Sequence, residues 1–167
     1  MAWNDYFEGW KEPELLTDGE IELLLLDVSA RIPFKLIAQF EVEVDDYAEE
    51  YTPVCRDFVV TAVDRREGNM FWAGGSQLQE GGFRNGTMDV APRHECFKPY
   101  LRSMSNMTEE EKKEYDTFKF LANTGNEYLP YEMSRFVDWL NQHMFDYRGL
   151  IEKGLALEAP DDMYKFD

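Results

Sequence analysis

The C-terminal third of the chain, residues 130–164, constrains the fold most strongly. Its apolar side chains recur at spacings of three and four, which is the period of one face of an α-helix. The residues on that face are Met133, Phe136, Val137, Leu140 and Met144, whereas Trp139 lies off it. We therefore expect an amphipathic helix from Pro130 to about His143, followed by a turn that ends near Gly154. We predict that the buried side chains of this region are Phe136, Val137, Leu140, Phe145, Leu150, Ile151 and Leu155.

The N-terminal half predicts one helix and then a strand. Thr17 or Asp18 can cap a helix that runs from about residue 18 to 29 and ends before Pro33, because the residue before a proline avoids the α region. Residues 35–44 then alternate between apolar and polar side chains, which is typical of a half-buried strand.

The middle of the chain predicts an antiparallel sheet. Residues 56–65 are rich in β-branched side chains and residues 70–73 resume the pattern after turn residues, which indicates a hairpin. Asn85-Gly86 predicts a second hairpin turn, and the glycines of this region are expected at turns and bulges. Residues 96–104 supply one more extended segment, and Pro99 favours an edge position for it.

A second C-terminal helix is predicted from about residue 108 to 121. Thr108 followed by Glu111 forms a capping box, and Glu109, Glu110 and Glu111 lie at the positive end of the helix dipole. We interpret residues 1–167 as a single domain of the α+β class. It comprises a short N-terminal helix, a small antiparallel sheet of three to five strands, and two to three C-terminal helices packed on one face.

Composition limits the classes of function. Apolar residues make up 44% of the 167, which favours a folded core, and the formal net charge is −17. This charge repels phosphates, so we expect neither direct nucleic-acid binding nor binding to anionic membranes. No signal-peptide pattern opens the chain, and the longest aliphatic run, residues 23–26, is too short to span a bilayer. We expect a cytoplasmic protein whose two cysteines, Cys55 and Cys96, are free and buried.

No catalytic, metal or cofactor site is predicted. His94-Glu95-Cys96 lacks the second half of a zinc deaminase signature, and no local signature supports pairing of Cys55 or Cys96 with His94 or His143. The acidic stretch at residues 45–50 lacks the frame of a calcium loop, so we interpret it as a solvated loop.

Four aromatic residues near the N-terminus form the candidate partner-binding element. Trp3, Phe7 and Trp10 are spaced like the anchors of a helix that lies in a groove of a partner, and Tyr6 lies between them. Residues 1–12 would then be an aromatic N-terminal arm. The interpretation that we favour is that these side chains pack on the body of the protein itself.

The C-terminal sequence resembles that of a set of uncharacterised small proteins from phages and integrated mobile elements of gut anaerobes. The matching residues are Lys98 to Leu101, Met107 to Glu111, and His143 with Phe145 to Ala156. This chain departs from the pattern at Met144, which is inserted, and at Ser103, where proline is usual. The resemblance covers about the last seventy residues. It implies a genomic setting and carries no activity.

These observations favour a non-enzymatic accessory protein of a phage or mobile element that acts by protein–protein binding to an unknown partner. Three alternatives stay open: an acidic nucleic-acid mimic that inhibits a host DNA- or RNA-binding protein, a phage structural or oligomeric component, and a small cysteine-dependent enzyme. Homo-oligomerisation also stays open.

Overall fold

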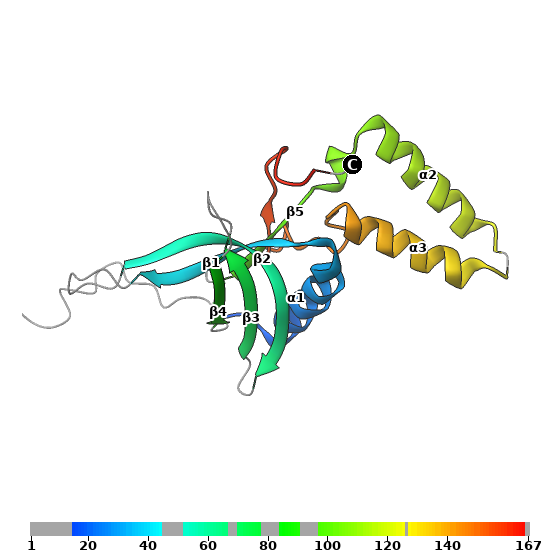
Figure 1. The fold of residues 1–167 in the computed structure, drawn as a ribbon. Helices are drawn as coiled ribbons and strands as arrows, with labels where there is room; N and C mark the ends of the chain where they lie inside the picture. Colours follow the sequence, from blue (N-terminus) through cyan, green and yellow to red (C-terminus); the bar gives the residue numbers. More distant parts are fainter. Residues whose placement is uncertain are drawn as a thin grey trace, which may run out of the picture.

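The computed structural model describes residues 15–44, 52–66, 70–77, 84–90, 97–125 and 127–165. They form an α+β fold in which a twisted sheet is joined to three helices (Figure 1). In chain order the elements are α1 (Asp18–Arg31), η2 (Ile32–Phe34), β1 (Ile37–Val44), β2 (Thr52–Arg66), β3 (Met70–Gln77), β4 (Arg84–Val90), β5 (Phe97–Leu101), η3 (Met104–Asn106), α2 (Glu109–Asn123), α3 (Leu129–Gln142) and β6 (Leu157–Glu158).

Helix α1 begins at a complete capping box. The Glu20 N–H donates to the Thr17 hydroxyl at 3.3 Å, and the Thr17 N–H donates to the Glu20 carboxylate at 2.8 Å. The helix runs slightly further than predicted, to Arg31, before Pro33 turns the chain into η2. Its buried face carries Ile21, Leu24 and Val28, which pack into the main core.

The sheet has the strand order β4-β3-β2-β1-β5-β6. Its five longer strands pair antiparallel, and the two-residue β6 pairs parallel to β5. The predicted hairpin of residues 56–65 and 70–73 is confirmed as β2 and β3. Strand alternation places Ala38, Phe40 and Phe58 on the face that α1 covers, and all three are buried.

The predicted hairpin turn at Asn85-Gly86 is wrong. Both residues lie inside β4, where Asn85 pairs with Ser76 and Gly86 pairs with Gly75 of β3. Asn-Gly specifies a reversal only when the flanking residues pair with each other, and here they pair with β3 instead. Gly75 lies inside β3, opposite the irregularity in β2 between Val60 and Ala62. A Cβ at this position would lie 2.9 Å from the Val59 carbonyl oxygen, so the close approach of β2 favours glycine.

Strand β5 lies next to the edge of the sheet. It pairs with β1 over residues 97–99, and on its other side only Tyr100 and Leu101 pair with β6. The predicted edge position is therefore wrong, because β6 occupies the edge and β5 lies between β6 and β1. Pro99 pairs with Ala38 of β1 and lies outside the short pairing with β6.

The two C-terminal helices form a hairpin, which we call the helical hairpin (α2 and α3). Figure 1 shows it extending away from the sheet as an antiparallel pair. The helices pack mainly on each other, and it is α1 that covers the sheet. The C-terminal helices exist as predicted, but they do not cover the sheet face. No helix in the described part of the chain is long and apolar enough to span a bilayer.

Burial in the C-terminal third follows the prediction only in part. Leu140, Phe145, Leu150 and Leu155 are buried as expected, whereas Phe136, Val137 and Ile151 are half-buried. Trp139 is the more buried aromatic of α3, with 8% of its surface exposed, and Met133 is 41% exposed. The periodicity locates an apolar face but not its partner: α3 meets the protein body only at its C-terminal end, so burial concentrates on residues 139–141.

Candidate functional site

Arg102, which follows β5, clamps the base of the helical hairpin. Its guanidinium donates to both carboxylate oxygens of Glu111 at 2.8 and 3.0 Å, and its Cζ lies 4.5 Å from the centre of the Phe145 ring. The Arg102 backbone exchanges hydrogen bonds with the chain after α3, donating to the Met144 carbonyl and accepting from the Asp146 N–H. Bidentate geometry of this kind fixes orientation as well as adding energy. The start of α2 and the end of α3 are thus tied to one residue of the body.

Glu111 is the ionisable group on which this clamp depends. Burial opposes its ionisation, but hydrogen bonds from Arg102 and from the Thr108 N–H, together with the charge of Arg102, outweigh burial and lower its pKa. The predicted capping box is confirmed, since the Glu111 N–H also donates to the Thr108 hydroxyl at 3.2 Å.

We expect the stabilisation from ionised Glu111 to disappear in acid. A carboxylate whose pKa is lowered in the folded state stabilises the fold above its ordinary pKa of 4.5, and this contribution is lost as pH falls through the lowered value. The difference in melting temperature between wild type and Glu111→Gln should therefore be largest near neutral pH and shrink as pH falls below 4.5. Gln keeps the capping box. A difference that stays constant with pH would contradict the assignment of Glu111 to the clamp.

An aromatic ladder fills the interior of the helical hairpin. Phe118 stacks on Phe136 at 5.2 Å between ring centres and lies 5.8 Å from Trp139, which in turn lies 5.6 Å from Phe145. The Trp139 indole N–H donates to Glu114 of α2 at 2.6 Å. Aromatic pairs contribute about 0.5–1.5 kcal/mol each beyond their buried area. The ladder joins α2, α3 and the chain after α3 into one packed unit.

A buried ionic joint connects α1 to the same region. Arg31 donates to both oxygens of Asp27 at 2.8 and 2.9 Å and to the Phe145 carbonyl at 2.9 Å, and both side chains are fully buried. The Arg148 guanidinium also lies 3.3 Å from Asp27. The Tyr147 ring lies against both guanidiniums, at 5.4 Å from Arg31 and 5.1 Å from Arg148. The joint therefore links α1 to the chain that follows α3 through buried contacts.

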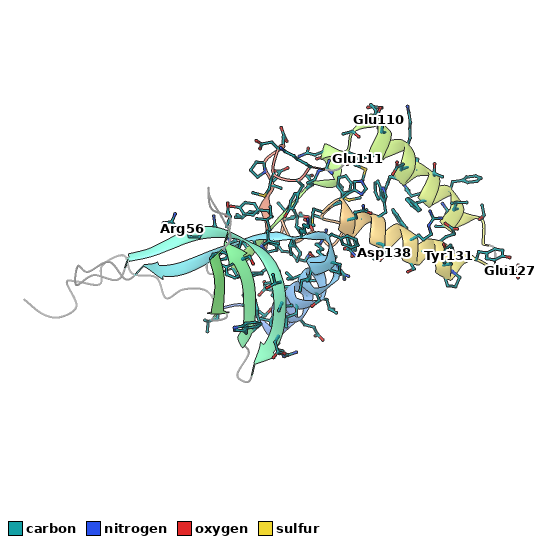
Figure 2. The ribbon with its side chains drawn as sticks, in the orientation of Figure 1. Arg56, Glu110, Glu111, Glu127, Tyr131 and Asp138 are labelled. Carbon is teal, nitrogen blue, oxygen red and sulfur yellow. The ribbon has the colours of Figure 1, made fainter. Side chains whose placement is uncertain are left out.

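The outer face of α3, opposite to the aromatic ladder, carries exposed side chains. Tyr131 is 62% exposed and Tyr128, just before the helix, is 63% exposed. We define the α3 stripe as the exposed residues along one side of α3 and just before it: Glu127, Tyr128, Tyr131, Ser134, Arg135 and Asp138. Figure 2 shows Glu127 at the distal end of the hairpin and Tyr131 and Asp138 along α3, on the side that faces away from α2.

The cysteine–histidine pair considered from the sequence is not assembled by Cys55 and His143. Cys55 is exposed on β2, so its predicted burial is wrong: strand alternation places it opposite to buried Phe58. The neighbouring Arg56 lies on a part of the sheet remote from α3 (Figure 2), whereas the His143 ring contacts Trp139 at the end of α3. Among the described residues, no group of three His, Cys, Asp or Glu side chains could hold a metal ion.

The open face of the sheet carries a tyrosine that is unsuited to act as a base. Burial, together with the charge of Asp57 and a hydrogen bond to it, raises the pKa of Tyr100 to about 12. Gln39 donates to the Tyr100 hydroxyl at 3.2 Å, and the Tyr164 hydroxyl donates to the Tyr100 carbonyl at 2.9 Å. The phenol is therefore neutral at physiological pH, and the network ties the C-terminal segment to β5.

The predicted partner-binding residues Trp3, Tyr6, Phe7 and Trp10 lie outside the described residues, as do His94 to Cys96 and the acidic stretch 45–50. Sequence reasoning missed the α3 stripe. The signal that indicates it is the spacing of Tyr128, Tyr131 and Arg135 on the side opposite to the apolar face.

The chain matches no family model, and no similar protein emerges from comparison with curated proteins or with solved structures.

Proposed function

We propose that this protein is a non-enzymatic accessory protein that binds another protein through the α3 stripe. The observation that carries the proposal is the exposure of Tyr131 on α3 and of Tyr128 at its N-cap. Tyrosine is enriched among residues that dominate binding energy, and an α-helix presenting side chains at i and i+3 is a common recognition element. The phage or mobile-element setting is supported by the C-terminal sequence resemblance alone.

The anchoring of the hairpin supports this proposal. The bidentate clamp at Arg102 and the aromatic ladder hold the exposed helix in one direction relative to the body of the protein. A preorganised binding face loses less conformational freedom on association than a flexible one, and this raises affinity without any new contact. The clamp, the ladder and the buried joint therefore fit a surface that must be presented in a fixed geometry.

The test compares proteins captured from host lysate by wild type, by Tyr131→Ser and by Leu26→Ser. Leu26 is 56% exposed on α1, so its replacement removes a similar exposed apolar group from the body of the protein. We expect Tyr131→Ser to weaken a wild-type interaction at least about tenfold and Leu26→Ser to leave it unchanged. Both variants should keep their stability within about 0.5 kcal/mol, because both side chains are exposed.

Two outcomes would contradict this proposal. One is a set of captured proteins that is the same for wild type and Tyr131→Ser. The other is a loss of the same proteins in both Tyr131→Ser and Leu26→Ser, which would indicate a binding surface on the body of the protein.

A further inference from the structure

The α3 stripe has a charge pattern as well as exposed tyrosines. Glu127 lies at its distal end and Asp138 at its proximal end, with Tyr131 between them. Asp138 lies within α3, and Glu127 lies in the turn two residues before α3 begins at Leu129. Within the described part of the chain, neither Glu127 nor Asp138 forms an ion pair.

The one cation of the stripe is already engaged. The Arg135 guanidinium lies 3.7 Å from the Glu132 carboxylate and 5.8 Å from the centre of the Tyr131 ring. These contacts offset its charge locally and hold it against the tyrosine that it flanks. The face of α3 is therefore negative at both ends and aromatic in the middle.

Charge distinguishes among the molecules that could bind the α3 stripe. A second copy of the chain carries the same net charge of −17 and would meet the stripe with like charge, and nucleic acid would do so too. A positively charged surface would be attracted by the two carboxylates, which would speed its association and fix its alignment on the stripe.

We propose that the α3 stripe binds a cationic protein surface, in which an apolar seat for the tyrosines is flanked on each side by Lys or Arg side chains. This inference rests on the proposed function, because it names the partner chemistry of the same face. Glu127 and Asp138 set register and association rate, and Tyr131 supplies the buried contact.

The test uses two synthetic amphipathic helical peptides as probes, one with Leu and Lys and a twin with Leu and Glu, titrated into the ¹⁵N-labelled full-length protein. We expect the Leu/Lys peptide to shift backbone amide resonances of residues 127–138 and to bind about fivefold more weakly to Glu127→Gln/Asp138→Asn. The matched control, Asp161→Asn/Asp162→Asn, removes the same charge from exposed positions in the C-terminal segment and should bind like wild type.

The inference is overturned if the Leu/Glu peptide binds equally well, if the control variant weakens binding as much as the stripe variant, or if neither peptide shifts these resonances at about 1 mM. Its failure is distinguishable from failure of the proposed function. If Tyr131→Ser loses a captured lysate protein while Glu127→Gln/Asp138→Asn retains it at full affinity, the stripe binds proteins but the partner is not cationic.

Discussion

Replacing Asp27 with alanine should destabilise the protein by about 3–5 kcal/mol, because it leaves the fully buried Arg31 guanidinium without its carboxylate partner. Arg148, whose guanidinium lies 3.3 Å from Asp27, would lose the same counter-charge. In a chain of this size the expected fall in melting temperature is on the order of 10 °C. Thermal and denaturant unfolding of Asp27→Ala measure the effect.

Two further variants separate burial of charge from loss of a side chain. Asp18 is exposed on the same helix, so Asp18→Ala should cost far less than Asp27→Ala. The double variant Asp27→Leu/Arg31→Met should recover part of the loss, since apolar residues of similar volume can replace a buried ion pair. Equal melting temperatures for Asp27→Ala and Asp18→Ala would contradict the buried joint.

Phe145→Ala should cost about 3–5 kcal/mol and should also loosen the helical hairpin. Phe145 is fully buried and contacts Trp139 at the base of the aromatic ladder, and its ring lies against Arg102. Its removal takes away the ring that contacts both Trp139 in the ladder and Arg102 in the clamp. We therefore expect Phe145→Ala to lower the unfolding midpoint. We also expect it to speed amide hydrogen exchange, relative to wild type, more in α2 and α3 than in the sheet.

The control for Phe145 is an exposed aromatic of the same hairpin. Phe120 is 69% exposed on α2, and Phe120→Ala should change stability by no more than about 0.5 kcal/mol. If Phe145→Ala leaves exchange in α2 and α3 unchanged, the hairpin is held by other contacts.

Local signals in the sequence predicted the elements well. The capping box predicted at Thr108 begins a helix, and Thr17, one of the two predicted caps of the first helix, also begins one with a capping box. A capping box is satisfied entirely within four residues and needs no tertiary partner. The alternation in residues 37–44 likewise specifies a strand. The position of the helical hairpin relative to the sheet could not be predicted, since periodicity shows that α3 has an apolar face but not which element covers it.

The anchoring contacts also lay beyond sequence reasoning. Arg31 reaches the Phe145 carbonyl across 114 positions of sequence, and Arg102 reaches the His143 carbonyl across 41. Nothing local distinguishes these arginines from the solvated ones. The exposed stripe on α3 was detectable in principle, because Tyr128, Tyr131 and Asp138 follow helical spacing, but the exposure of these residues depends on the hairpin projecting from the body.

The most direct test of the central claim, that the outer face of α3 binds a partner protein, is site-specific photo-crosslinking in cells. The photoreactive amino acid p-benzoylphenylalanine is placed at position 131 in one variant and at position 26 in another, both of which are exposed. We predict a discrete crosslinked species from position 131 and none from position 26. Crosslinking from position 26 alone, or from neither position, would contradict the claim.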